Sequence, residues 1–282
     1  MKTLTLMIGE SGSGKSTIAK TMLDRCTLRV NRDSIRKMLF ETWNARYEKI
    51  VEKLEFEAAG QALDAGFNVI VDDLNINSRT RQQWEEFAKK KGAEFCKYEV
   101  NVSLDECVRR DSHREGRDRV GRSVITKQFI RNERPEVFKN TPTVLVDVDG
   151  TLADCEGVRS PYDESRVGED KVHWNIARMV CEESRENQII IVSGRHEDCG
   201  PDTEDWLLHK ARVPFQGLLM RNRGDFLSSD VIVKEKLLAM ILKYVDKANI
   251  RLVIDDRPRV IRFWRSVGLT VFAARGEDLE DF

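Results

Sequence analysis

The sequence contains no hydrophobic run that approaches the roughly 18 residues needed to cross a membrane, and its N-terminus has no signal-peptide pattern. Its six cysteines are scattered without a Cys-x-x-Cys pair, which argues against a disulfide framework. His196, Cys199 and His209 match no common zinc-ligand spacing and are interpreted as loop and surface residues. We therefore expect a soluble, cytoplasmic protein with reduced thiols and no membrane partner.

The chain also lacks a net charge of either sign, since it carries only -1 over 282 residues. This balance hides an asymmetry: the residues up to Asn140 sum to +5 and those after it to -6. The first half is therefore the better binder of polyanions, although the excess is modest and local clusters must decide. The length fits two domains of about 140 residues each.

A phosphate-binding loop follows the first predicted strand, Thr3 to Ile8. Gly9 to Thr17 reads G-E-S-G-S-G-K-S-T, which fits G-x-x-x-x-G-K-[ST], and Ser16 to Cys26 is expected to form the next helix. In this motif backbone N–H groups surround the phosphates, the lysine reaches the β and γ phosphates and the hydroxyl holds Mg²⁺. The sequence thus predicts an ATP or GTP site; its residues are Gly9, Gly12, Ser13, Gly14, Lys15, Ser16 and Thr17, with Ser16 as a metal ligand.

The second predicted strand, Leu28 to Asn31, is followed by Asp33. Because ligands bind at the carboxyl edge of open parallel sheets, Asp33 is placed to accept the proton of an incoming hydroxyl. Arg36, one helical turn later, is placed to hold an anionic acceptor. The alternative is that Asp33 only caps the helix predicted from Ser34 to Phe40.

Two further segments of the first half carry candidate residues. Phe67 to Asp73 is an apolar strand ending in two acids, of which Asp73 is favoured for the acceptor site and Asp72 comes second. The segment from Arg109 to Arg122 has six arginines among acids and glycines, which predicts a poor helix and a lid. Arg114 is the candidate for neutralising charge on the transferred phosphoryl group, against the alternative of a solvated surface. This order of elements predicts a small P-loop kinase domain over residues 1–140.

A polar, proline-containing segment near Thr141 marks the predicted start of a second domain, residues 141–282. The strand beginning at Val144 runs into Asp147 and Asp149 in D-x-D-G-T. Residues two apart on a strand point the same way, so we expect both carboxylates to meet one phosphate. Asp147 can then attack phosphorus while Asp149 protonates the leaving oxygen and activates water.

The remaining pieces of a phosphatase follow in order. The strand from Ile189 ends in Ser193, followed by Arg195, and the helix predicted from Val231 to Val245 carries Lys234. Asp255 and Asp256 end a later strand and would complete an oxygen-only Mg²⁺ site with Asp147. Arg159 is a weaker candidate for binding substrate. Each residue has a structural alternative, such as a turn or a helix cap, but one shared site explains their order better.

With both halves read, the chain resembles the polynucleotide kinase/phosphatases of T-even phages, which are end-healing enzymes with an N-terminal P-loop kinase and a C-terminal phosphatase of the haloacid dehalogenase (HAD) type. The resemblance covers nearly the whole chain. Its specific motifs are N-R-D-x-x-R (Asn31 to Arg36), D-V-D-G-T-L-A (Asp147 to Ala153), R-x-P-Y-D (Arg159 to Asp163), V-S-G-R (Val192 to Arg195) and V-K-E (Val233 to Glu235).

The resemblance implies a two-domain α/β fold, with a parallel sheet in the kinase domain and a HAD-like Rossmannoid phosphatase domain. It implies that Lys15 and Ser16 bind ATP and Mg²⁺, that Asp33 is the general base, that Arg36 and Asp73 serve the acceptor and that Arg114 contacts ATP. In the second domain it implies Asp147 as nucleophile and Asp149 as acid/base. Phosphate and metal would be handled by Arg159, Ser193, Arg195, Lys234, Asp149, Asp230, Asp255 and Asp256.

From this resemblance we expect transfer of the ATP γ-phosphate to 5′-hydroxyl ends of RNA or DNA and removal of phosphate, including a possible 2′,3′-cyclic phosphate, from 3′ ends. Cooperation with a polynucleotide ligase and a homo-oligomer are also implied. Two alternatives stay open. One is a small-molecule kinase fused to a metabolite phosphatase, and the other is a nucleotide-dependent binding module with an inert phosphatase half.

Overall fold

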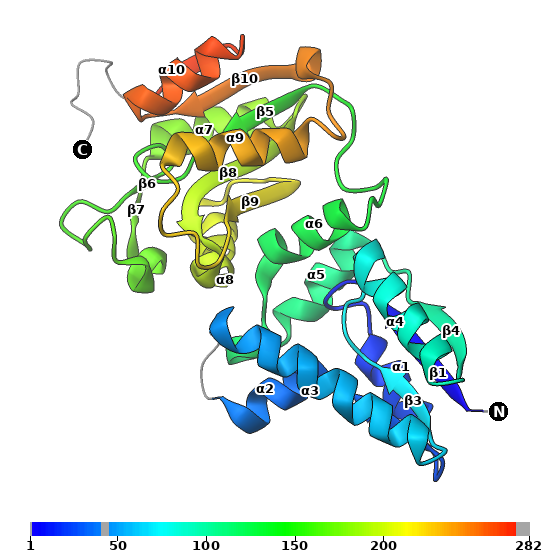
Figure 1. The fold of residues 1–282 in the computed structure, drawn as a ribbon. Coiled ribbons are helices and arrows are strands. Elements are labelled where there is room, and N and C mark those ends of the chain that lie inside the picture. The colour runs from blue at the N-terminus through cyan, green and yellow to red at the C-terminus, as the bar shows by residue number, and fades with distance from the viewer. Residues whose placement is uncertain (1, 41–44, 275–282) are drawn as a thin grey trace. The chain divides into compact units, whose positions relative to one another are not determined.

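The computed structural model describes residues 2–40 and 45–274 (Figure 1). The chain divides into two compact units, Met1–Arg110 and Asp111–Phe282. Both are α/β, and both central sheets are parallel, as the sequence predicts. None of the helices in the described part of the chain is both long enough and apolar enough to span a bilayer.

The first unit has a four-stranded parallel sheet in the order β2-β3-β1-β4. The register pairs Leu4 with Val69 on β3 and with Phe95 on β4, so β1 lies in the interior of the sheet. The strands are β1 (Thr3–Ile8), β2 (Thr27–Val30), β3 (Asn68–Val71) and β4 (Glu94–Glu99), and the helices are α1 (Lys15–Thr21), α2 (Arg32–Leu39), α3 (Ala45–Asp64), α4 (Ser78–Lys90) and α5 (Leu104–Ser112).

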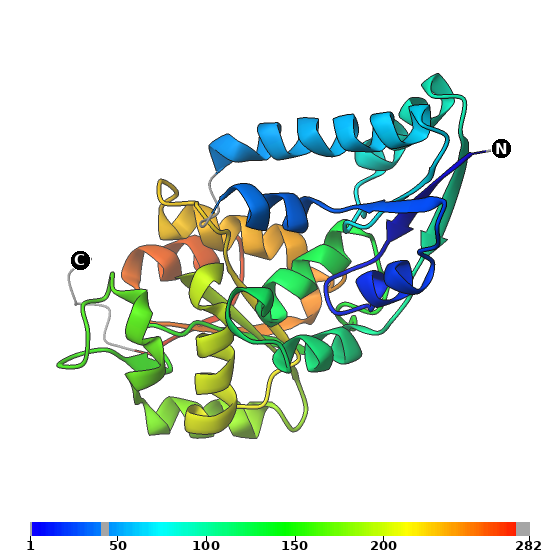
Figure 2. The same ribbon diagram turned by 90° about the horizontal axis from the view of Figure 1, so that it is seen from below.

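Helices cover both faces of this sheet, which explains why β3 is apolar after its first residue and why β1 ends in a continuous apolar run, residues 6–8. One face packs against α3 and α4 around Trp84, and the other face packs against α1 through Met7, Ala19 and Ile70. Figure 2 shows α3 and α1 on opposite sides of the strands. The carboxyl ends of β1, β2 and β3 therefore open at one edge, where the predicted kinase residues begin.

The second unit has a five-stranded parallel sheet in the order β11-β10-β5-β8-β9, with β5 at its centre. A two-stranded antiparallel pair, β6 and β7, follows β5 in the chain. The strands are β5 (Thr143–Val146), β6 (Ala153–Asp154), β7 (Lys171–Val172), β8 (Gln188–His196), β9 (Gly217–Arg221), β10 (Ile250–Asp255) and β11 (Val271–Ala273). The helices are α6 (Gly121–Arg131), α7 (Trp174–Glu183), α8 (Gly200–Asp205) with its π-helical continuation Trp206–Ala211, α9 (Asp230–Ile241) and α10 (Pro258–Ser266).

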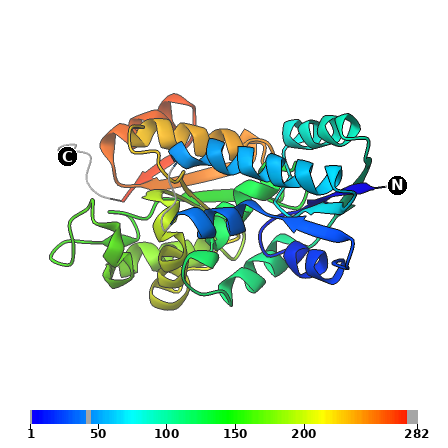
Figure 3. The ribbon, with the colours of Figure 1, turned by 60° about the horizontal axis from the view of Figure 1, so that its bottom comes forward.

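The core of this unit also lies on both faces of the sheet. Val144 and Val146 face one cluster that includes residues of α7 and of the π-helical segment with Trp206 and Leu207. In Figure 3 the helices α9 and α10, drawn in orange, lie on one side of the sheet, and α8, in yellow-green, lies on the other. The central strand is thereby buried, and Asp147 emerges directly from its carboxyl end.

Several predicted bounds change in the structure. The helix after the phosphate loop ends at Thr21 rather than Cys26. The segment predicted as a poor helix is helical at its start, because α5 continues to Ser112 and is supported by ion pairs of Glu106 with Arg109 and Arg110. A 3₁₀ turn, Gly116–Asp118, precedes α6.

Helix α6 belongs to the second compact unit, although it precedes the predicted domain boundary at residue 141. Lys127 is buried and donates to Asn222 Oδ1 at 2.7 Å and to Met220 O at 2.5 Å, and it pairs with Glu197 at 2.7 Å. Arg122 pairs with Glu204 at 3.0 Å. The division into domains 1–140 and 141–282 stays a prediction.

Candidate active sites

The phosphate loop owes its shape to glycines at positions where a side chain would be strained. Gly14 caps α1 with φ of 97°, and a Cβ atom on Gly12 would lie 2.3 Å from the carbonyl oxygen of Cys107. Lys15 is buried in the loop and donates to Glu10 O at 2.8 Å. The N-terminus of α1 thus presents N–H groups and a lysine, the combination that binds phosphate.

Ser16 and Asp72 form the candidate metal site of the first unit. The Ser16 hydroxyl donates to Asp72 Oδ1 at 3.2 Å, and Arg29 Nε donates to Asp72 Oδ2 at 2.7 Å. A P-loop hydroxyl beside an acid at the end of a strand is the pair that holds Mg²⁺ in P-loop nucleotide-hydrolysing enzymes. The residues present therefore fit Mg²⁺, and Asp72, which the sequence analysis ranked second, is the acid that contacts the loop.

Asp33 lies in the first turn of α2 at the same edge of the sheet. Asn31, not Asp33, caps this helix, because its side chain accepts from the Ser34 N–H at 2.9 Å. The Asp33 side chain is 75% exposed and accepts from Arg36 Nη1 at 2.5 Å. Arg36 in turn donates to both carboxylate oxygens of Glu48, at 2.8 and 2.7 Å. The predicted base and the predicted acceptor arginine are therefore in contact.

A pair of acids, the buried Glu55 and the partly exposed Asp73, contacts the start of α2. Arg32 Nε donates to Glu55 Oε2 at 2.7 Å and lies 3.6 Å from Asp73 Oδ2, and the Arg32 N–H donates to Asp73 Oδ1 at 3.1 Å. Burial, and then the neighbouring Asp73, raise the pKa of Glu55 to about 9, although Arg32 opposes this shift. The predicted acceptor residue Asp73 thus holds the start of α2 in place together with Glu55.

Arg114 belongs to the second unit, where it donates to Asp111 Oδ1 at 3.3 Å. Its predicted contact with ATP stays a prediction. Arg110, one turn earlier on α5, donates to Ser13 O at 3.0 Å and is the arginine that contacts the phosphate loop within the first unit. Arg110 lies on α5, whereas Arg114 follows the end of that helix at Ser112, and the signal that could have identified Arg110 was its place in the same arginine-rich segment.

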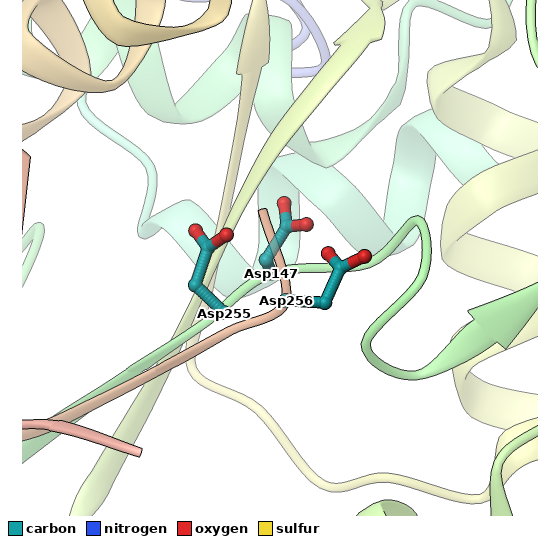
Figure 4. A group of neighbouring side chains, drawn as sticks. All are labelled: Asp147, Asp255 and Asp256. Carbon is teal, nitrogen blue, oxygen red and sulfur yellow. The ribbon is translucent and has the colours of Figure 1, made fainter. Parts of the chain in front are cut away.

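In the second unit Asp147, Asp255 and Asp256 gather where β5 and β10 end (Figure 4). One carboxylate oxygen of each lies within 4.8 Å of the others. Lys234, from α9, contacts Asp147 and lies 3.5 Å from Asp255 Oδ2. Among the described residues this is the group of acids that fits an oxygen-ligated Mg²⁺, since hard cations prefer carboxylate oxygens.

The charges around Asp147 oppose one another. Burial raises its pKa, Lys234 lowers it, and Asp255 and Asp256 raise it again, with a net upward shift. The pKa of Lys234 is raised because Asp147 and Asp255 outweigh the effect of its burial. The lysine thereby stays charged beside the predicted nucleophile and offsets the repulsion among the three acids.

Asp149 faces a different set of partners. β5 ends at Val146, so both acids follow the strand: the Asp147 N–H still donates to Ile254 O of β10 at 2.9 Å, and Asp149 forms an isolated bridge with Ala153. That the two carboxylates meet one phosphate stays a prediction. Asp149 accepts from Arg195 Nη2 at 2.7 Å and from Arg159 Nη2 at 3.0 Å, and both arginines also bind the buried Asp170. Burial alone would raise the pKa of Asp149, but Arg195 and Arg159 hold it below its ordinary value.

Ser193 is buried near the end of β8, and its Oγ accepts from the Arg195 N–H at 3.2 Å. Asp230 is not brought into the acid group, because it pairs with Arg221 at 2.6 Å, with Arg259 at 3.2 Å and with Arg257. Asp149 and Asp230 are thus paired with arginines. The geometry supports a role as metal ligands for Asp147, Asp255 and Asp256. The metal-ligand role of Asp149 and Asp230 stays a prediction without support from these contacts.

Sequence reasoning also missed residues that build this site. Asp170 binds both arginines, and Thr151 Oγ1 donates to Asp256 Oδ1 at 3.3 Å. Thr151 could have been found, since it is the threonine of D-x-D-G-T. Asp170 follows Arg159 by eleven residues outside any motif, and the sequence holds no local signal for it.

Comparisons with known proteins assign the two halves separately. Residues 141–278 match the family model described as the polynucleotide kinase PNKP phosphatase domain, and residues 4–135 match that of an AAA domain. A protein of Autographa californica nuclear polyhedrosis virus, named a bifunctional polynucleotide kinase/RNA ligase, is 30% identical over 306 residues. That match covers 99% of this chain and 43% of the viral protein, so the chain spans less than half of this relative.

A chain in the structure of the Pnkp1/Rnl/Hen1 RNA repair complex is 26% identical, with a TM-score of 0.44. The match covers 99% of this chain and 97% of that chain.

Proposed function

We propose that this chain, which joins an AAA-type P-loop domain to a HAD-type phosphatase domain of the polynucleotide kinase PNKP family, is a bifunctional nucleic-acid end-healing enzyme. One domain transfers the γ-phosphate of ATP to a 5′-hydroxyl end, and the other removes phosphate from a 3′ end. The observation that carries this proposal is the presence, in one chain, of a phosphate loop with an adjacent carboxylate and arginine and of a separate three-acid phosphatase site.

In the kinase site, Lys15 and the N–H groups at the start of α1 bind the phosphates of ATP. Asp33 takes the proton of the 5′-hydroxyl as the hydroxyl oxygen attacks the γ-phosphorus, and the bond from that phosphorus to the β–γ bridging oxygen breaks to release ADP. Arg36 holds the acceptor's phosphate. Arg36 must then exchange part of its contact with Glu48 for the nucleic acid. Arg114 is proposed to contact ATP. Bound Mg²⁺, held by Ser16 with Asp72, would neutralise charge on the phosphates.

In the phosphatase site, Asp147 attacks the phosphorus of the 3′-phosphate and the ester bond to the leaving 3′-oxygen breaks. Lys234 offsets the charge of Asp147. Asp149 gives a proton to the leaving oxygen and then takes one from the water that hydrolyses the aspartyl-phosphate. A phosphate that shares Arg159 and Arg195 weakens their hold on Asp149, which allows it to carry this proton. Bound Mg²⁺, held by Asp147, Asp255 and Asp256, would polarise the phosphoryl oxygens.

The family of the phosphatase domain favours a polynucleotide over a small metabolite. The viral relative is named for a kinase joined to an RNA ligase, which supports RNA ends and a ligase as functional partner. Asp73, Ser193 and Lys234 complete the proposed substrate sites, and we propose action in the cytoplasm. A domain boundary near residue 141 agrees with matches that end at 135 and begin at 141.

Two assays test the proposal. Label from γ-labelled ATP should appear on an oligonucleotide with a 5′-hydroxyl end, and inorganic phosphate should be released from one with a 3′-phosphate, both in Mg²⁺. A fused small-molecule enzyme would label neither RNA nor DNA, but would phosphorylate alcohols of low mass. A binding module would hydrolyse and transfer nothing, and either result would contradict the proposed function.

A further inference from the structure

The second unit contains a cavity of about 310 Å³ beside the phosphatase site. This volume is at the lower end of the range of about 300–1,000 Å³ that is usual for small-molecule sites. Its walls come from the turn after Asp149, the end of β7, the first turn of α7 and the residue after β11. The lining residues are Gly150, Thr151, Val172, His173, Trp174, Asn175, Ile176 and Ala274.

Trp174 is the most unusual residue of this lining. This residue is 52% exposed, whereas Trp84, Trp206 and Trp264 are at most 2% exposed. Tryptophan is usually buried to a large extent because its ring carries so much apolar surface. An accessible indole at the wall of a cavity is available to cover the face of a flat ligand.

The other lining residues select a neutral ligand. None of them is Asp, Glu, Lys or Arg, so the cavity offers no fixed charge for a phosphate. Thr151, His173 and Asn175 supply polar groups to this lining, which can hydrogen-bond the edge of a neutral ring. An aromatic wall with a few polar groups suits a nucleobase.

The cavity shares its wall with the acid group of the phosphatase site. Thr151 Oγ1 donates to Asp256 Oδ1 at 3.3 Å. Gly150 lies so close that an added Cβ atom would be 2.0 Å from Asp256 Oδ2. A phosphoester whose phosphate lies at Asp147 therefore has the rest of its terminal nucleoside near these two residues.

We propose that this cavity is a base-binding subsite, in which Trp174 stacks on the base of the nucleotide that carries the terminal 3′-phosphate. The inference rests on the proposed function, because it requires a nucleic-acid end as substrate. It adds a recognition element that the phosphate contacts cannot supply, since those contacts do not distinguish a nucleotide from any other phosphomonoester. Stacking on an aromatic ring is tolerant of sequence, so all four bases should be accepted.

The test compares Trp174→Ala and Trp174→Phe in the full-length protein on two oligonucleotides that each end in a 3′-phosphate. One has an ordinary terminal base and the other has an abasic terminal sugar. Loss of one base–aromatic stack corresponds to a drop of roughly 5- to 150-fold in kcat/KM. We expect this drop for Trp174→Ala on the ordinary end and a much smaller one for Trp174→Phe. On the abasic end, wild type and Trp174→Ala should differ by less than about twofold.

Phe272→Ala is the matched control, because Phe272 is an aromatic residue of the same unit that is 41% exposed and does not line the cavity. It should keep wild-type activity on both ends. Unchanged kcat/KM of Trp174→Ala on the ordinary end, or an equal loss on both ends, would overturn the subsite. If wild type instead hydrolyses glycerol phosphate and neither oligonucleotide, the proposed function fails, which is a different result.

Discussion

Replacing Glu55 with glutamine should make the first unit more stable than wild type, by an amount that grows as pH rises. Glu55 is fully buried on α3, between Val51 and Ala59 on the same stripe of the helix, and it faces Asp73 and Arg32. Burial and Asp73 together keep its carboxyl group protonated. Glutamine has nearly the same shape and is neutral at every pH, so it reproduces the protonated side chain.

The magnitude follows from the two pKa values. The pKa of Glu55 is about 9 in the folded protein, against an ordinary value of 4.5. Because the pKa is raised in the folded state, the protonated carboxyl group contributes fully to the free energy of unfolding below about pH 4.5. This contribution is lost as pH rises toward 9. Within this window the free energy of unfolding of the wild-type protein falls as pH rises, by roughly 3 kcal/mol from pH 6 to pH 8.

Urea denaturation of the full chain at pH 5 to 8.5, followed by tryptophan fluorescence, measures this difference. Trp84 stacks on Phe56 with ring centroids 3.9 Å apart, so its fluorescence reports on unfolding of the first unit. The part of the signal that is lost in a Trp84→Phe variant identifies the transition of that unit. Glu57→Gln is the matched control, since Glu57 lies on the same helix with a side chain that is 51% exposed. It should change stability by less than about 0.5 kcal/mol at every pH. A Glu55→Gln advantage that stays constant or shrinks between pH 6 and pH 8 would refute the reasoning.

The remaining predictions concern the two activities. Lys15→Ala should abolish phosphoryl transfer from labelled ATP and spare phosphate release, and Asp147→Asn should do the reverse; loss of both activities in either variant would contradict two independent sites. Asp72→Asn should raise the Mg²⁺ concentration that half-saturates the kinase by roughly 10- to 100-fold. An unchanged Mg²⁺ titration would show that Asp72 is not part of the metal site. Arg195→Gln should lower phosphatase kcat by on the order of 10²–10⁴ and, because Arg195 holds the pKa of Asp149 down, should shift the Asp149 limb of the pH–rate profile upward; a shift to lower pH would show that Arg195 acts otherwise.

The phosphate loop and the three acids at the ends of β5 and β10 could be predicted because their residues are fixed by short spacings. The loop is recognised by its glycines at strained positions and by a lysine before a hydroxyl, and the acids by their place at strand ends. Local geometry puts these groups at the carboxyl edge of a sheet. The parallel sheets follow in the same way from apolar runs that need cover on both faces. The meeting of Asp147 with Asp255 and Asp256 follows from the same rule, because the carboxyl ends of parallel strands share one edge of the sheet.

Other parts of the sites depend on such distant contacts. Asn31 rather than Asp33 caps α2, although both are suitable capping residues, because only the geometry of the first turn decides between them. Asp230 carries a carboxylate that could bind a metal, but it forms ion pairs with three arginines from other elements. The burial of Glu55 could have been suspected from the sequence, because this acid lies between apolar residues at four-residue spacing. The pairing of Asp170 with Arg159 and Arg195 has no such signal in the sequence.

Circularisation by an RNA ligase tests the central claim most directly, because sealing requires a 5′-phosphate and a 3′-hydroxyl on the same molecule. A linear RNA with a 5′-hydroxyl and a 3′-phosphate should become a circle when this protein, ATP, Mg²⁺ and the ligase are all present. Neither the Lys15→Ala variant nor the Asp147→Asn variant alone should yield circular RNA. A mixture of the two variants should restore circularisation. An RNA that stays linear with the wild-type protein, while a control RNA with healed ends is sealed, would contradict the account.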